Sequence, residues 1–317
     1  MVTLERRSRK GPVLTPSSLP CLGDMPTINI TEGCAHGCTY CYIRGYSSYP
    51  GDGRVVLIEN MPELVRTELA RKRQRPRRVY FSPSSDAFQP LAEVQAVTYE
   101  TMAAILEAGI EVDFLTKGLI GDQFFPLFAR FSSRVFAQIG ITTLDERLWQ
   151  AFEPGAASPS QRLGNIDNLA RVGIEAAARL DPLIPGITDT DAGLACLLAD
   201  LERRKVRHAA ASYLFLRPAF AARLAEQVRN LREPGTSAVK WNWRSMAAGI
   251  GGGQMMDVRQ RQESFSRLET LAARFHISIH VCRCKNPDLA ESGCQIAGPT
   301  SDVPQAPPLP LFDTGGQ

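Results

Sequence analysis

The stretch Cys34-Ala-His-Gly-Cys38-Thr-Tyr-Cys41 places three cysteines in one short loop, directly after the strand-like run Thr27-Ile-Asn-Ile-Thr31. Three thiolates can hold three corners of a cubane 4Fe-4S cluster and leave the fourth iron open to bind a reactive molecule. Structural zinc also uses cysteines at such separations, but it needs a fourth protein ligand. His36 could be that ligand only if this tight loop were strained. The spacing therefore favours an iron-sulfur cluster over zinc.

The composition is that of an ordinary globular protein. The chain has 317 residues, of which 44% are hydrophobic and 22% charged, enough for a sizeable core. It contains no run of about 18 apolar residues that would predict a membrane span, and its first twenty residues lack the apolar stretch of a signal peptide. Eight cysteines without an export signal indicate metal or redox chemistry rather than disulfides. We therefore expect a cytoplasmic protein.

Short β-branched runs alternate with amphipathic stretches from residue 27 onward, which is the pattern of βα units and a parallel sheet. This predicts an α/β fold of the partial (β/α)6 barrel type, with its active site at the carboxyl ends of the strands. The cysteine loop follows the first expected strand. Strands are expected at about 27–31, 78–82, 111–116, 134–140, 175–180, 208–215 and 277–282, and helices at about 61–72, 92–108, 120–131, 159–172, 189–204, 217–231 and 257–275.

The chain divides into four expected parts. Residues 1–25 form an N-terminal arm, 26–240 the barrel, 241–298 a C-terminal cysteine-rich extension, and 299–317 a disordered tail that is rich in proline. Within the extension, Gly249-Ile-Gly-Gly-Gly-Gln254 is expected to be a flexible loop.

The cysteine spacing, together with the aromatic Tyr40 before the last cysteine, resembles the radical S-adenosylmethionine (SAM) superfamily. The resemblance implies that the open iron chelates the amino and carboxylate groups of SAM. It also implies that an electron from the reduced cluster cleaves the sulfonium and gives a 5′-deoxyadenosyl radical. A reducing partner of the flavodoxin or ferredoxin type would supply that electron.

Within the superfamily, residues 25–185 resemble the spore photoproduct lyase group, also called DNA repair photolyases. The resemblance rests on Cys38-Thr-Tyr-Cys-Tyr42, on Asp113-Phe-Leu-Thr-Lys-Gly118, and on Phe152-Glu-Pro-Gly155 with the following Arg162. Several separated matches in the right order are much harder to obtain by chance than one motif.

The same resemblance implies roles for individual residues. Tyr40 and Tyr42 would pass a hydrogen atom, with Tyr40 beside the adenine of SAM, and Lys117 would contact the SAM carboxylate. Ser84 would hydrogen-bond the amino or carboxylate group, and Gln138 falls near another SAM-contacting position, where the group has a different residue. The structural alternatives are a lysine whose charge lies in water and a serine that starts a helix.

One position departs from the group. Just before its Ser-Asp element the lyase has a cysteine that gives a hydrogen atom to the product radical, and here Pro83 occupies the matching place. The resemblance therefore implies the radical-forming machinery but not the cleavage of a thymine dimer. The substrate is expected to be a nucleobase or a small metabolite.

A second set of cysteines, Cys282, Cys284 and Cys294, follows the last expected strand. That strand end should open on the same edge of the sheet as the first loop, which predicts an auxiliary iron-sulfur cluster there. The cluster could bind substrate, relay electrons or donate sulfide, and an open iron or a fourth ligand such as Cys21 would distinguish these roles. Zinc and buried unligated thiols are the alternatives.

A hypothesis of a different class is a non-catalytic, zinc-stabilised nucleic-acid-binding protein. The run Arg71–Arg78 carries six positive charges, which could neutralise phosphates. We favour the alternative that it is the solvated end of a helix, because it leads directly into an expected buried strand. The net charge of +3 favours neither interpretation.

Overall fold

The computed structural model describes residues 2–17, 21–231, 242–248, 251–282 and 284–289. Its centre is an eight-stranded sheet in the order β14-β10-β9-β8-β7-β6-β3-β2, in which all strands except β2 (Thr15–Pro16) are parallel. In the described part of the chain the two outer strands do not pair with each other, so the sheet is an open barrel. The parallel strands are β3 Pro26–Ile28, β6 Arg78–Phe81, β7 Glu111–Thr116, β8 Val135–Gly140, β9 Ala177–Leu183, β10 His208–Tyr213 and β14 Ser278–Val281.

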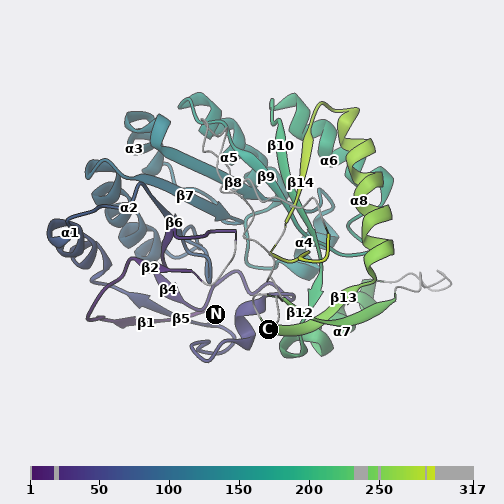
Figure 1. The fold of residues 1–317 in the computed structure, drawn as a ribbon, viewed down its shortest axis with the longest axis horizontal. Helices are drawn as coiled ribbons and strands as arrows, with labels where there is room; N and C mark the ends of the chain where they lie inside the picture. Colours follow the sequence, from purple (N-terminus) through teal and green to yellow (C-terminus); the bar gives the residue numbers. More distant parts are fainter. Residues whose placement is uncertain (1, 18–20, 232–241, 249–250, 283, 290–317) are drawn as a thin grey trace, which may run out of the picture.

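Helices follow the strands in turn, and Figure 1 shows α2, α3, α5, α6 and α8 along the outer side of the curved sheet. Each of the seven expected strands and seven expected helices overlaps an observed one, so the predicted α/β architecture is confirmed. The helices are α1 Met61–Arg71, α2 Ala92–Glu107, α3 Phe124–Arg130, α4 Glu146–Phe152, α5 Pro159–Arg171, α6 Asp191–Arg203, α7 Pro218–Leu231 and α8 Val258–Ala273, with short 3-10 helices at Tyr42–Gly45 and Ser132–Arg134.

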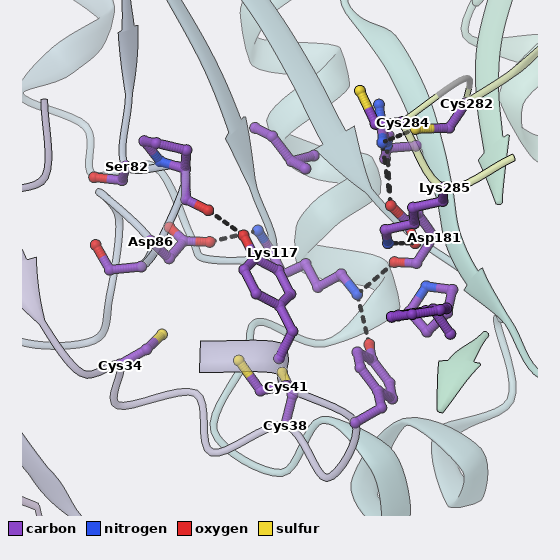
Figure 2. Close-up of a pocket in the computed structure, with 18 of the residues that line it drawn as sticks. Cys34, Cys38, Cys41, Ser82, Asp86, Lys117, Asp181, Cys282, Cys284 and Lys285 are labelled. Carbon is purple, nitrogen blue, oxygen red and sulfur yellow. Dashed lines mark hydrogen bonds and ion pairs between the residues drawn. The ribbon is translucent and has the colours of Figure 1, made fainter. Parts of the chain in front are cut away.

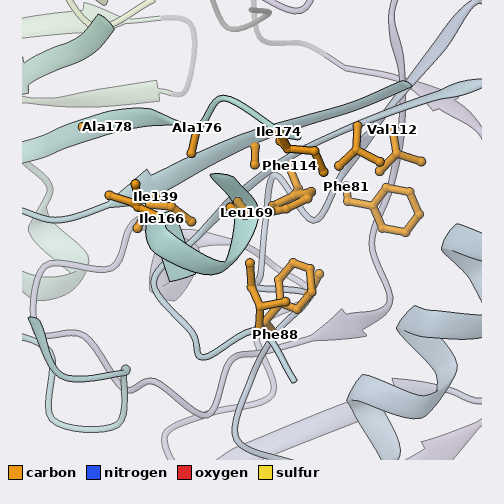
Figure 3. Packing of buried hydrophobic residues seen from close by; sticks show 14 of the residues in the cluster. Phe81, Phe88, Val112, Phe114, Ile139, Ile166, Leu169, Ile174, Ala176 and Ala178 are labelled. Atoms are coloured by element: carbon orange, nitrogen blue, oxygen red, sulfur yellow. The ribbon is translucent and has the colours of Figure 1, made fainter. Parts of the chain in front are cut away.

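Strand β7 shows how the sheet separates core from site. Alternate side chains of a strand point to opposite faces, and Val112 and Phe114 are fully buried in the core with Phe81 of β6 and Leu169 of α5 (Figure 3). Leu115, on the other face, lines a pocket inside the barrel. Burial of each large apolar side chain stabilises the fold by about 1.5–3 kcal/mol.

Two small sheets flank the barrel. In the first, β1 (Thr3–Arg7) pairs in parallel with β5 (Arg54–Ile58), which also pairs with β4 (Thr31–Glu32), so the start of the N-terminal arm is a strand. In the second, β13 (Gly251–Met256) lies between β11 (Phe215–Leu216) and β12 (Trp243–Ala248).

The expectation of a flexible glycine loop was therefore wrong from Gly251 onward. Gly253 has a packing role in this sheet, because a Cβ there would lie 2.8 Å from the carbonyl oxygen of Leu216. Among the described helices, none is both long and apolar enough to cross a membrane.

Candidate active site

The two sets of cysteines face one pocket at the carboxyl ends of the strands. Cys34, Cys38 and Cys41 line it together with Cys282 and Cys284. Figure 2 shows the first three on one loop and the other two across the pocket. The expectation that both sets open on the same edge of the sheet is confirmed for these five residues. Cys294 lies outside the described residues.

The cysteine loop is held by the segment Phe152–Gly155. The backbone N–H of Thr39 donates to the carbonyl oxygen of Phe152 at 2.9 Å, and the N–H of Gly155 donates to that of His36 at 2.9 Å. A Cβ on residue 155 would lie 2.5 Å from the carbonyl oxygen of Ala35, so only glycine allows this close approach. The Phe-Glu-Pro-Gly motif thus acts as the support of the cysteine loop.

We expect Gly155→Ala to lower the cluster content of the protein, because the added methyl group pushes the supporting segment away from the loop. Iron and sulfide per chain after anaerobic purification should fall at least by about half. Gly164→Ala is the matched control, since a Cβ there meets no atom within 4 Å. Alanine at this helical position should stabilise the protein by about 0.5–1 kcal/mol. Unchanged iron content in Gly155→Ala would show that the support is dispensable.

Burial controls the ionisation of the three thiols. It raises the pKa of Cys34 well above its usual value, with a further contribution from the charge of Asp86. It also raises the pKa of Cys38 to about 12 and that of Cys41 less strongly. The iron-free loop therefore keeps its protons, and iron must displace them because the thiolate is the ligand. A partly buried loop that presents three thiols to a pocket is suited to a cluster with cysteine ligands.

His36 is buried and faces Asp86, with its Nδ1 atom 3.6 Å from the carboxylate. Burial lowers the pKa of this imidazole, so it is neutral. Among the residues that the structure describes, no three His, Cys, Asp or Glu side chains converge closely enough to hold a single metal ion. In a cubane each cysteine binds a different iron atom, so its sulfurs need not converge as they do around zinc.

Lys117 lies at the centre of the pocket and uses all three of its N–H donors. They point to the hydroxyl of Tyr40 at 2.5 Å, the Oε1 atom of Glu153 at 2.8 Å and the carbonyl oxygen of Asp181 at 2.9 Å. An ammonium group has three donors and no acceptor. Lys117 can therefore contact the carboxylate of a ligand only if it gives up one of these three partners.

Glu153 is 2% exposed and lies between two cations, Lys117 and Arg162. Arg162 is itself 1% exposed and also donates to the carbonyl oxygens of Ala157 and Gly140, at 2.8 and 2.9 Å. Burial alone would raise the pKa of Glu153, but the two cations outweigh it and hold the pKa at about 2. The carboxylate is thus ionised, and it fixes the position of Lys117.

The two tyrosines that flank the last cysteine also line the pocket. Tyr40 donates to Glu153, and Tyr42 donates to the carbonyl oxygen of Pro83. Burial raises the pKa of both phenols well above the usual value, and the charge of Glu153 adds to this effect at Tyr40. Both side chains therefore keep the O–H bond from which a hydrogen atom could be taken.

The turn after β6 presents two serines to the pocket. Ser82 and Ser85 line it, and their buried hydroxyl oxygens have no hydrogen-bond partner within the described part of the chain. Because a buried polar group without a partner is costly, these hydroxyls are suited to a polar ligand. Ser84 instead lines a neighbouring cavity with Asn29, whose side chain accepts the backbone N–H of Ser84. Gln138 is buried on β8 but is not among the residues that line the pocket.

The wall opposite the cysteine loop carries charged residues that the sequence had not identified. Asp181 accepts from Lys285 at 2.6 Å and from Arg179 at 3.1 Å. Burial opposes ionisation of this carboxyl group, but the two cations lower its pKa overall. The sequence indicated these residues only indirectly: Asp181 lies near the end of an expected strand, and Lys285 follows Cys284.

The basic run Arg71–Arg78 leads into the amino end of β6, away from the pocket at the carboxyl end. Arg77 and Arg78 pair with Glu111, at 3.3 and 2.8 Å. Part of the charge of this run is thus neutralised within the protein.

Comparison with known proteins agrees with this geometry. A radical SAM isomerase of Pseudomonas phage M6, described as acting on Nα-GlyT, is 31% identical over 159 residues, which cover 50% of this chain and 33% of the phage protein. An uncharacterized protein of Mycobacterium tuberculosis is 28% identical over 184 residues, which cover 55% of this chain and 54% of that protein. The matches thus span a third to a half of these relatives.

Among solved structures, a mutant of spore photoproduct lyase with bound AdoMet and dinucleoside spore photoproduct superposes with a TM-score of 0.67 and 16% identity. The superposition covers 88% of this chain and 81% of the lyase, which shows a shared fold. The family model of the radical SAM superfamily matches residues 28–197, just over half of the 317 residues. The chain belongs to the radical SAM superfamily.

Proposed function

We propose that this protein cleaves SAM reductively at a 4Fe-4S cluster held by Cys34, Cys38 and Cys41, and uses the resulting 5′-deoxyadenosyl radical on a further substrate. The observation that carries the proposal is that three cysteines of one loop line a pocket at the carboxyl ends of parallel strands. This is the edge at which α/β barrels bind their ligands. The cluster and SAM supply the radical chemistry, and the chain supplies binding and orientation.

The residues of the pocket have different proposed roles in binding SAM. The hydroxyls of Ser82 and Ser85 are available to the amino and carboxylate groups of SAM. Lys117 offers a cation to the SAM carboxylate once it exchanges one of its present partners. Tyr40, within the cysteine loop, is held by Lys117 and Glu153 where it can pack against the adenine. Tyr42 remains a candidate for hydrogen-atom transfer.

The substrate that we propose is a nucleobase or a small metabolite. Support comes from the phage isomerase, described as acting on Nα-GlyT, and from the lyase with its dinucleoside ligand. Tyr42 reaches Pro83, whose position in the lyase group holds a cysteine, so thymine-dimer cleavage is not part of the proposal. A flavodoxin or ferredoxin would supply the electron, and an auxiliary cluster at Cys282, Cys284 and Cys294 completes the proposed cofactor set.

The function is tested on anaerobically purified protein reduced with dithionite in the presence of SAM. We expect a brown protein that contains iron and sulfide and that forms 5′-deoxyadenosine. Addition of thymine-containing oligonucleotides or of free nucleosides should raise this rate for the correct substrate class. A colourless protein with zinc, no iron and no SAM cleavage would instead support the nucleic-acid-binding alternative, because zinc has no redox chemistry.

The serines give a sharper test of how SAM is bound. We expect Ser82→Ala and Ser85→Ala each to weaken SAM binding about fivefold, since a lost hydrogen bond costs about 1 kcal/mol. Ser84→Ala, two residues away at most, should leave the affinity unchanged because this side chain lines the neighbouring cavity. Equilibrium dialysis with labelled SAM measures all three. A loss confined to Ser84→Ala would instead support the role that the family resemblance implies.

A further inference from the structure

Cys21 lies in the same pocket as the other five described cysteines that line it, although it is far in sequence from Cys282 and Cys284. It belongs to a turn that precedes β3, in which Leu22 is 4% exposed and packs against Tyr80 of β6. Leu115 of β7 contacts the same cluster. This apolar contact anchors the turn on the inner face of the sheet, so the position of Cys21 in the pocket is fixed by packing.

The turn meets the C-terminal cysteines directly. The backbone N–H of Cys21 donates to the sulfur of Cys284 at 3.0 Å, across 263 positions of the sequence. On the neighbouring thiol, Arg179 donates to the sulfur of Cys282 at 3.4 Å. Cys282 and Cys284 are buried, at 1% and 7% exposure. N–H donors to sulfur are a regular part of the surroundings of iron-sulfur clusters, where they set the reduction potential.

The charges of this wall also suit thiolates. Arg179 and Lys285 bring two cations, of which Asp181 neutralises one. Deprotonated cysteines would add negative charge to a buried site, and a cation next to them lowers that cost. The wall therefore provides hydrogen bonds and a compensating charge for thiolate ligands.

From these contacts we infer that Cys21 is a ligand of the second iron-sulfur cluster, together with Cys282 and Cys284. The inference deepens the proposed auxiliary cluster and rests on it. Cys21 thus adds a third cysteine to the two that the structure describes at this wall. The eighth cysteine, Cys196, is exposed on α6.

The three cysteines place the second cluster at the wall of the pocket that faces the cysteine loop. It also joins the N-terminal turn to the segment after β14.

The test uses the full-length chain with Cys34, Cys38 and Cys41 all replaced by Ala, so that only the second cluster can contribute iron. We expect this background protein, purified anaerobically, to retain about four iron atoms and an EPR signal after reduction. Adding Cys21→Ala should lower iron and sulfide by at least half or convert the signal to that of a three-iron cluster. Cys282→Ala should do the same, and Cys196→Ala should change neither quantity.

A further variant separates ligation from folding. Cys21→Ser offers a weaker oxygen ligand of nearly the same size, so it should retain iron but shift the EPR spectrum and the reduction potential. Full iron and an unaltered spectrum in both Cys21 variants, with loss in Cys282→Ala, would overturn the role of Cys21 alone. Loss of all iron from the background protein would show that the second cluster does not form. SAM cleavage by the wild type is measured separately, so neither result bears on the first cluster.

Discussion

Replacement of Cys38 by alanine should reduce 5′-deoxyadenosine formation to the level of a sample without protein. Cys38 is the middle one of the three proposed ligands and the most buried cysteine of the loop, so its loss leaves the proposed cluster with two cysteines of the loop. With only two cysteines left, the loop no longer binds the cubane stably. Reductive cleavage of SAM requires the cubane, so activity should be lost. The measurement is the rate of 5′-deoxyadenosine release by reduced protein under anaerobic conditions.

The matched control is Cys196→Ala, which removes an exposed thiol outside the pocket and should leave the rate unchanged. The Cys38 variant should keep its fold, because the loop is held mainly through its backbone by Phe152 and Gly155. Circular dichroism of both variants checks this. Sustained 5′-deoxyadenosine formation by a folded Cys38→Ala protein would refute the ligand assignment and with it the proposed function.

The second large effect is on stability. We expect Glu153→Gln to lower the free energy of unfolding by about 3–5 kcal/mol, because it leaves Lys117 and Arg162 as buried cations without a counter-charge. Urea unfolding of the iron-free protein, followed by circular dichroism at pH 7, measures the difference. Glu175→Gln, an exposed carboxyl group, is the control and should change stability by less than about 0.5 kcal/mol.

The same pair of proteins should show a pH dependence of known sign. The pKa of Glu153 is about 2 in the folded protein against an ordinary value of 4.5. A lowered pKa means that the ionised carboxylate stabilises the fold above pH 4.5, by about 3 kcal/mol. This contribution is lost as the pH falls from 4.5 toward 2, so the gap between wild type and Glu153→Gln should narrow there. A gap that stays constant down to pH 3 would show that Glu153 is not ionised in the fold.

The architecture could be predicted from the sequence because its strands are short and buried, and its helices long and amphipathic. Helix α4 was missed because Phe152 is the one buried residue among its seven, so no apolar periodicity marks it, although Asp145 caps it. Strand β13 was missed because its glycines are typical of loops, while in the structure they allow close packing against Phe215. Both errors concern segments whose structure depends on contacts far away in the sequence.

The candidate site could be predicted in its cysteines but not in its hydrogen bonds. The choice among Ser82, Ser84 and Ser85 depends on the local backbone, since Ser82 has a φ of 53° and turns the chain in a way that no residue pattern announces. Likewise, the sequence led us to expect Lys117 at the SAM carboxylate but gave no sign that its ammonium group already donates to Glu153 and to the backbone of Asp181. These hydrogen-bond partners of Lys117 are set by the three-dimensional packing and not by a local residue pattern.

The two walls of the pocket are synthesised at different times during translation. The first loop has its support as soon as Gly155 has emerged, whereas the opposite wall must wait for β14 and for Cys284, which follows Gly155 by 129 positions. Because chains fold from the N-terminus as they are made, the first loop can be ordered while the rest is still being synthesised. The wall with Cys282 and Cys284 is therefore assembled after the first loop, and strand β14 must pair with β10 before all the described cysteines of the pocket face one another.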